Sequence, residues 1–210
     1  AVEVLDLRNE EWTNESGIIT KRKPLKGDPE GAIAFNLSRH SLFYGFLGEG
    51  RYYGADYDAG VVNSHHHGEV QEYLLCATPI KADVFINMPK LKTHKKTGVT
   101  LNLKNLVGIK EKKNWLPHHT SGSPETNGDE FPDLPLRRKL EQTSVKMARM
   151  LALKVPGLGP KVAKQMRKAG TAVFGNGREV VRSGNWYGND TTWRMVLDLN
   201  RCLLYGKDDG

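Results

Sequence analysis

The chain has 210 residues, of which 38% are hydrophobic and 26% are charged, and its formal net charge is +7. This length supports one domain, or at most one and a half. No apolar run reaches the roughly 18 to 20 residues that a membrane span needs. The first residues also lack the charged start and apolar core of a signal peptide. We therefore expect a cytoplasmic protein, either free or attached to the surface of a membrane.

The positive charge is concentrated in two blocks. Residues 81–119 carry nine lysines against Asp83 and Glu111, a net charge of +7, and residues 137–170 carry a net +9. The rest of the chain is acidic. This pattern differs from that of a uniformly basic nucleic-acid coat protein.

The N-terminal part predicts two strands and a long loop. Residues 2–7 alternate apolar and polar side chains, and residues 31–37 are a second candidate strand, while residues 9–31 are mostly polar and rich in turn formers. Few aliphatic residues occur between 38 and 64, which predicts an ordered, functional loop. Residues 70–78 fit a short helix or a strand.

Histidines in this loop suggest a divalent metal. Adjacent residues of an extended segment face opposite sides, so His65 and His67 share a side. Together with His118, His119 and Asp129 further along the chain, they form a candidate ligand set of imidazole and carboxylate. The favoured alternative is that the histidines hydrogen-bond an anionic ligand or the loop backbone. Asp56 is a further candidate for a metal or base role.

Residues 82–88 are apolar, β-branched and aromatic, which predicts a buried strand that Pro89 ends. Cationic and polar side chains follow this strand at once. Ligands collect at the carboxyl ends of strands in open α/β sheets, so we predict that these residues bind an anion. Lysines serve as point charges, and His94 could be the general acid or base. The alternative is a solvated basic face. The predicted ligand-binding residues here are Lys90, Lys92, Thr93 and Lys95, with Asn105 and Lys110 downstream.

Residues 134–153 have a near-helical spacing of leucine and methionine with lysines and arginines between them. A Pro- and Gly-rich break at 156–160 separates this predicted helix from a second basic stretch at 161–168. Such a hairpin could contact an anionic membrane. The favoured alternative is that its apolar stripe packs on the core.

The C-terminal part predicts a helix from about residue 192 to Leu204, capped by Asp190 or Thr191. Asn189 and Asp190 could also place an amide and a carboxylate on a ligand. We therefore predict a ligand-binding role for Asn189 and a catalytic role for Asp190, beside His94.

Two motifs carry a family resemblance, Pro89-Lys90-Leu91-Lys92-Thr93-His94 and Leu103-Lys104-Asn105-Leu106-Val107-Gly108. Together they resemble the signature of the DUF362 family, which has no assigned function. The resemblance extends from about Tyr53 to the Gly188-Asn189-Asp190 stretch and the chain end. It implies that relatives continue into another strand, so that the present chain is a truncated domain.

Some members of this family carry cysteine clusters for iron–sulfur centres. Cys76 and Cys202 are far apart in apolar surroundings, and two cysteines cannot supply a four-thiolate site. We therefore expect buried free thiols and no iron–sulfur cluster.

These patterns predict an α/β fold with a mixed or mainly parallel sheet, flanking helices and a basic helical excursion. Residues 1–133 would form the α/β core with the lysine-rich site, residues 134–170 a basic helical insertion, and residues 171–210 the return to the core. The favoured function is an enzyme that binds a small molecule carrying phosphate or carboxylate, with the reaction type open. The alternative is a non-catalytic module that binds nucleic acid or, through residues 137–168, an anionic membrane.

Overall fold

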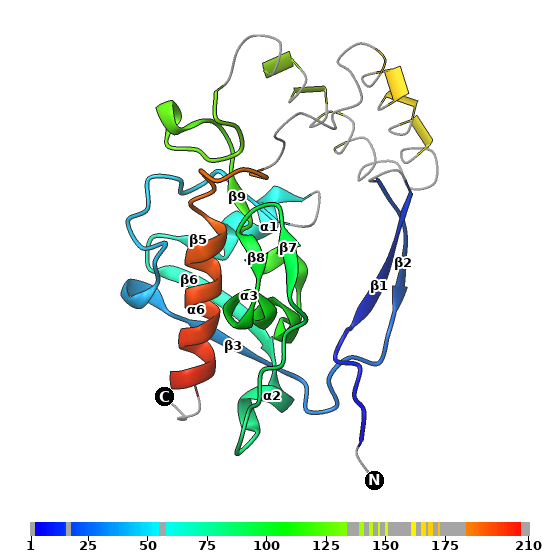
Figure 1. The fold of residues 1–210 in the computed structure, drawn as a ribbon, viewed down its shortest axis with the longest axis vertical. Helices are drawn as coiled ribbons and strands as arrows, with labels where there is room; N and C mark the ends of the chain where they lie inside the picture. Colours follow the sequence, from blue (N-terminus) through cyan, green and yellow to red (C-terminus); the bar gives the residue numbers. More distant parts are fainter. Residues whose placement is uncertain are drawn as a thin grey trace.

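The computed structural model describes residues 3–15, 18–54, 58–133 and 184–206, together with isolated positions between 139 and 172 (Figure 1). Asp56 and most of the predicted helical insertion at 134–170 lie outside the described residues. The secondary structure that positions the candidate site therefore comes from the first 133 residues and from one C-terminal helix.

Every strand pair in the described part of the chain is antiparallel, so the prediction of a mainly parallel sheet is wrong. The fold is broadly α/β, but its strands form small sheets rather than one. The central sheet has the order β3 (Ala32–Asn36), β6 (Val70–Cys76) and β5 (His66–His67). The other pairs are β1 (Glu10–Glu15) with β2 (Ile18–Pro24), β4 (Tyr52–Tyr53) with β9 (His119–Thr120), and β7 (Lys92–His94) with β8 (Gly98–Thr100).

Of the helices in the described residues, one is long and the others are short. α6 (Thr192–Tyr205) runs along one side of the small sheets in Figure 1 and confirms the predicted C-terminal helix. None of the helices among the described residues is long and apolar enough to cross a membrane. The shorter ones are α1 (Ala59–Ser64), α2 (Ala77–Lys81) and α3 (Asn102–Asn105), with the 3₁₀ turns η1 (Ser38–His40), η2 (Leu106–Ile109), η3 (Lys113–Trp115) and η4 (Pro124–Thr126).

The core lies between β6 and α6. Alternate residues of β6 point inward, and Tyr73 and Leu75 are fully buried. On α6, Met195, Leu199 and Cys202 recur at helical spacing and are buried against the same cluster. The burial of residues 70–75 has a period of two, which is the period of a strand and not of a helix. Cys76 and Cys202 are buried free thiols, as predicted.

A buried carboxylate ties α6 to the loop after β3. Asp198 accepts hydrogen bonds from Ser41 Oγ at 2.5 Å and from Tyr73 OH at 3.1 Å. Arg201 Nη1 lies 3.1 Å from the same carboxylate. Partners on three elements keep this charge from being isolated in the core. These hydrogen bonds also fix the position of α6 along its axis relative to β6.

Three predictions about the N-terminal half have different outcomes. The strand at 31–37 is confirmed by β3. The strand at 2–7 is wrong, because the described residues 3–8 pair with no other strand. The hairpin β1–β2 instead forms within the polar stretch, where Trp12 pairs with Arg22 in the ladder.

The predicted buried strand at 82–88 is also wrong. These residues belong to no described sheet, and the inward and outward positions alternate along them: Phe85 and Asn87 are half-buried, whereas Val84, Ile86 and Met88 are 74%, 74% and 84% exposed. The composition suits a strand, but no neighbouring strand is placed beside it in the described part of the chain.

Candidate lysine and histidine site

The first part of the site comes from the hairpin β7–β8. Side chains alternate along a strand, so Lys92 and His94 share one side of β7 while Thr93 takes the other. The backbone N–H of Lys96, in the turn, donates to His94 Nδ1 at 3.2 Å. A neutral His94 ring therefore carries its proton on Nε2. Burial lowers the pKa of His94, and the charges of Lys104, Lys96 and Lys92 lower it further.

Two lysines from the next segment are partly buried. Lys104 lies on α3, which packs against α6, and Lys110 follows η2. Burial lowers the pKa of both ammonium groups. Neighbouring cations add to this effect, since Lys110 and Lys92 act on Lys104 and Lys113 acts on Lys110.

His118 is held by its main chain and by its ring. Its carbonyl accepts hydrogen bonds from Asn189 Nδ2 at 3.0 Å and from Thr192 Oγ1 at 2.6 Å. Its ring Nδ1 lies 2.8 Å from the carbonyl oxygen of Leu116. A carbonyl only accepts, so Nδ1 carries the proton and Nε2 keeps its lone pair.

The protonation state of His118 follows from its surroundings. Burial lowers its pKa to about 3, and the charges of Lys96, Lys104 and Lys110 contribute to the shift. The ring is therefore neutral at physiological pH. The lone pair on Nε2 can accept a hydrogen bond from a bound molecule, but the low pKa makes the ring a weak base until bound negative charge offsets the lysines.

His119 joins the hairpin to this segment. Lys96 Nζ lies 3.3 Å from His119 Nδ1, and the His119 ring stacks on Tyr53 with the centroids 5.5 Å apart. The second predicted histidine pair therefore does lie beside the lysine motif. We call Lys92, His94, Lys96, Lys104, Lys110 and His118 the lysine–histidine cluster.

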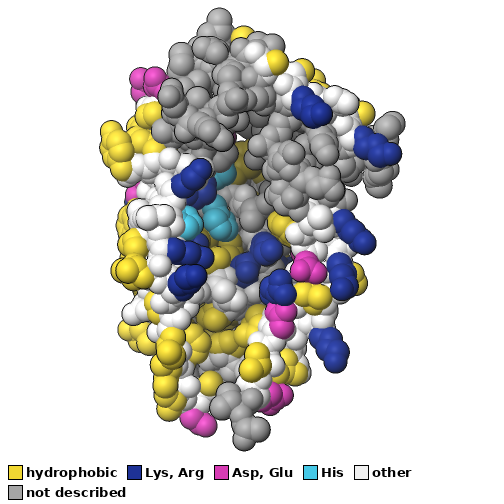
Figure 2. Space-filling view, turned by 45° about the vertical axis from the view of Figure 1, so that its right-hand side comes forward, with side chains coloured by type: hydrophobic (Ala, Val, Ile, Leu, Met, Phe, Trp, Pro, Cys, Tyr) yellow, Lys and Arg dark blue, Asp and Glu magenta, His cyan; other side chains and the backbone are white. Residues whose placement is uncertain are grey.

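Figure 2 shows histidine side chains recessed between lysine and arginine side chains on this face. Among the described residues, no carboxylate forms an ion pair with Lys92, Lys104 or Lys110. Lys104 and Lys110 are thus partly withdrawn from water without a carboxylate in ion-pair contact among the described residues, although the charge of Glu111 acts on Lys110.

Three of the predicted functional residues make the joint between α6 and the loop that carries His118. Asp129 Oδ1 accepts from the backbone N–H of Thr120 at 2.6 Å, and its Oδ2 accepts from those of Asp190 and Thr191 at 2.8 Å each. Asn189 Oδ1 accepts from Thr192 N–H at 2.8 Å. Asn189 and Asp129 thus bind the amides at the start of α6, where Asp190 or Thr191 was predicted to cap the helix.

Asp190 is engaged by its own helix. Its carboxylate accepts from Trp193 Nε1 at 2.7 Å and pairs with Arg194 Nη2 at 3.0 Å. Both carboxylate oxygens thus have partners one turn along α6. This gives Asp190 a structural position beside the N-terminus of the helix.

The first histidine group lies elsewhere. His65 Nδ1 is 2.7 Å from Glu72 Oε2, and its ring stacks on Trp115 with the centroids 3.4 Å apart. His67 is exposed. No group of three or more histidine, cysteine, aspartate or glutamate side chains in the described part of the chain could hold a metal ion. The predicted metal site stays a prediction.

The remaining predicted ligand-binding residues lie at the rim. Lys90, Thr93 and Lys95 are exposed, and Asn105 donates to Asn87 Oδ1 at 2.7 Å, which fastens α3 to the segment before β7. Lys96 and Lys104 are missing from the predicted set. The alternation of Lys92, His94 and Lys96 could have identified Lys96 if a hairpin had been recognised at this position. Lys104 lies in the second of the two sequence motifs, which could have marked it, and α3 brings it into place.

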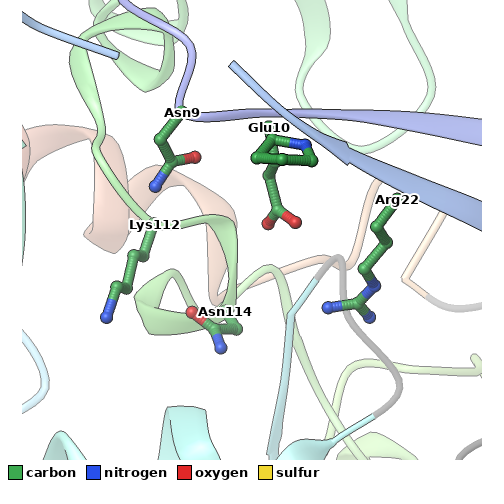
Figure 3. A pocket seen from close by; sticks show the side chains of 6 residues that line it. Asn9, Glu10, Arg22, Lys112 and Asn114 are labelled. Carbon is green, nitrogen blue, oxygen red and sulfur yellow. The ribbon is translucent and has the colours of Figure 1, made fainter. Parts of the chain in front are cut away.

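A separate cavity of about 370 Å³ lies between the hairpin β1–β2 and the segment around η3 (Figure 3). None of the lysine–histidine cluster lines it. Lys112 and Asn114 lie across the space from Asn9, which precedes β1, and from the hairpin residues Glu10 and Arg22, and Pro24 also lines the cavity. The lining contains both a carboxylate and cations, so it has no single preference for an anion.

Comparison with known proteins gives one match. The family model described as "Domain of unknown function (DUF362)" matches residues 50–203, which include the whole lysine–histidine cluster. The comparisons with curated proteins and with solved structures gave no match.

Proposed function

We propose, for this chain, which belongs to the DUF362 family, that the lysine–histidine cluster binds a small molecule carrying phosphate or carboxylate groups. The observation that supports this most is the partial burial of Lys104 and Lys110 with no carboxylate in ion-pair contact among the described residues. Cations in such positions are unfavourable unless an anion compensates them.

The interaction energy between these ammonium groups and a bound anion supports a specific ligand rather than loosely held counter-ions. At an effective dielectric constant of about 20, a unit anion roughly 4 Å from one ammonium gains about 4 kcal/mol before desolvation is subtracted. Several cations act at once in the cluster. A ligand with at least two negative charges matches it best, and a diphosphate or a dicarboxylate meets this requirement.

We further propose that the protein is an enzyme in which His118 is the proton acceptor once a bound anion offsets the lysine charges that help to lower its pKa. The lone pair on His118 Nε2 supports this role better than the positions of His94, which lies at the edge of the hairpin, or Asp190, which its own helix engages. Lysines beside a proton acceptor stabilise negative charge that develops on the substrate. The supported reaction class is proton transfer on a bound anion.

The alternative of a non-catalytic module for nucleic acid or membranes gains less support. The nucleic-acid reading rests on both basic blocks and the membrane reading on residues 137–168, and most of this second block lies outside the described residues. The histidines are recessed between exposed and half-buried cations, which supports a compact ligand better than an extended nucleic-acid strand (Figure 2).

Calorimetric titration with inorganic phosphate, pyrophosphate and citrate at pH 7 tests the binding proposal. Lys104→Gln and Lys110→Gln should each weaken pyrophosphate binding by about 10- to 100-fold, since each removes a charge-assisted hydrogen bond of about 1.5 to 3 kcal/mol. The matched control is Lys95→Gln, an exposed lysine of the same basic segment, which should change affinity by less than about fivefold.

Equal losses at Lys95 and Lys104 would mean that the basic segment attracts anions without forming a site. Absence of binding of all three anions to the folded wild-type protein would reject the proposal.

A further inference from the structure

We propose that Thr100 is a further ligand-binding residue of the lysine–histidine cluster, and that its hydroxyl donates a hydrogen bond to an oxygen of the bound phosphate or carboxylate. This inference rests on the proposed function and adds a neutral donor to the charged groups of the site. Two observations support it, the position of Thr100 in the hairpin β7–β8 and the surroundings of its hydroxyl group.

The hairpin places Thr100 on the side of the cluster. Residues that lie directly opposite each other in an antiparallel pair point to the same side of the sheet. Thr100 pairs with Lys92, and Gly98 pairs with His94. The side chains of Thr100, Lys92 and His94 therefore share one side of the hairpin.

Lys104 comes to the same side from the next element. α3 begins two residues after Thr100 and packs against β8 (Figure 1). The charge of Lys104 lowers the pKa of His94, and the charge of Lys92 lowers the pKa of Lys104. The ammonium group of Lys104 thus lies near both residues that share a side with Thr100. An anion held between these groups is close to the Thr100 side chain.

The hydroxyl of Thr100 is buried without a partner. The residue is 6% exposed, and its Oγ1 has no hydrogen-bond partner in the described part of the chain. A buried hydroxyl in this state is unfavourable because it has lost its bonds to water. Nearly all buried polar groups of folded proteins have a partner, so this one indicates a bound molecule. Beside Lys92 and Lys104, the surrounding charge favours an anion.

Ordinary structural roles do not require this hydroxyl. A residue needed only to form a strand could be valine, which is also β-branched and buries no polar atom. Thr100 does not cap α3 either, because the N-cap of this helix is Leu101 and no side-chain capping bond is present. A hydroxyl can accept from an ammonium group while it donates to a ligand oxygen. It therefore suits a bridge between Lys104 and a bound anion.

Side chains of the cluster must move before a ligand reaches the hydroxyl. Oγ1 is shielded from water, but Lys92 is exposed and lysine side chains have flexible stems. Attraction by an anion can therefore turn these ammonium groups and open a path to Oγ1.

Thermal unfolding of Thr100→Val without any added anion tests the state of the hydroxyl. Valine keeps the shape of threonine and removes the unsatisfied group, so the melting temperature should rise by about 2 to 6 °C in circular dichroism. Thr97→Val is the matched control in the same hairpin. Its Oγ1 already donates to the Val99 carbonyl at 3.1 Å, so its removal should not raise the melting temperature. A melting temperature of Thr100→Val that does not rise would mean that the hydroxyl is already bonded, which overturns the proposal.

Calorimetric titration with pyrophosphate at pH 7 tests the contact with the ligand. Thr100→Val should weaken binding by about 10- to 100-fold, because a hydrogen bond to a charged acceptor is lost. Thr100→Ser keeps the hydroxyl and should stay within about fivefold of the wild type. Thr97→Val should bind as tightly as the wild type, because its hydroxyl lies in the exposed turn.

The outcomes separate this inference from the proposed function. If Lys104→Gln weakens pyrophosphate binding but Thr100→Val binds like the wild type, the site stands and Thr100 is not part of it. If Thr100→Ser loses as much affinity as Thr100→Val, the methyl group matters rather than the hydroxyl, and the inference fails. If the folded wild-type protein binds none of phosphate, pyrophosphate and citrate, the proposed function fails and this inference with it.

Discussion

Replacing Asp129 by asparagine should loosen the joint that holds His118 in place. In the wild type, one carboxylate oxygen accepts from Thr120 N–H and the other from the amides of Asp190 and Thr191. Asparagine keeps one acceptor oxygen. If that oxygen stays on the two helix amides, the new NH₂ group faces the Thr120 N–H, and two donors oppose each other.

The structure allows a rough magnitude for this change. Loss of one hydrogen bond to a charged acceptor costs about 1.5 to 3 kcal/mol, and the buried Thr120 amide that remains unsatisfied adds about 1 to 3 kcal/mol. Burial raises the pKa of Asp129, so the neutral side chain recovers part of the desolvation energy of the carboxylate. We expect the free energy of unfolding to fall by about 2 to 4 kcal/mol.

Urea unfolding followed by circular dichroism measures this change. Glu125→Gln, an exposed carboxylate in the same loop, is the control and should stay within about 0.5 kcal/mol of wild type. An Asp129→Asn protein as stable as the control would refute the structural role. If Asp129 were instead a metal ligand, EDTA would destabilise the wild type and leave the variant unaffected.

Three further predictions concern the core and the site. His66 has a pKa of about 4 in the folded protein against 6.5 when exposed, so the unfolded chain takes up its proton first as the pH falls. His66 should therefore lower the free energy of unfolding by up to about 3 kcal/mol between pH 7 and pH 4, and His118, with a pKa of about 3, should add a similar drop. In urea titrations His66→Gln should reduce the pH dependence by about half; an unchanged slope would contradict this. Leu199→Ala should cost about 2 to 5 kcal/mol by the same assay, because the side chain is fully buried, whereas the largely exposed Leu204→Ala should cost under about 0.5 kcal/mol. Binding of phosphate should raise the lowered pKa of His94 and so take up protons, which calorimetry in buffers of different ionisation enthalpy detects; equal heats in all buffers at every pH from about 5 to 7 would contradict it.

The core could be predicted where one element carries its own periodicity. The apolar positions of α6 recur every three or four residues, so its buried face can be read locally. β3 follows from the same kind of pattern. In β6 the burial alternates but the apolar residues at 73–76 are consecutive, so its sequence fits a helix or a strand equally. The direction of the strands could not be predicted. The antiparallel order of β3, β6 and β5 depends on the turns between them, and the residues of these turns are compatible with more than one turn geometry.

The segment at 82–88 marks the limit of local patterns. Its residues are good strand formers, yet a strand exists only when a neighbour supplies hydrogen bonds, and neighbours are set by the whole topology. The same limit applies to the site. The basic segment pointed to anion binding, but whether Lys104 or Lys95 is drawn inward depends on α3 and the hairpin rather than on composition.

Asp129, Asn189 and Asp190 illustrate a different limit. A carboxylate or amide near a helix start has the same sequence signature whether it binds a ligand or the free amides of the helix. In this protein Asp129 and Asn189 bind amides. Whether such a side chain binds a ligand or the helix amides depends on how closely its loop approaches the start of α6. Asp129 and Asp190, which meet there, are 61 positions apart in the sequence.

The long sequence separation of the α6 contacts has a consequence for biosynthesis. Ser41 meets Asp198 across 157 residues, and the His118 carbonyl meets Thr192 across 74. During translation, the ribosome must therefore release α6 before the His118 loop can be locked, and until then Tyr73 and Leu75 lack their helical cover. The nascent chain should depend on chaperones during this interval, because closing such long loops is slow and leaves apolar surface in water.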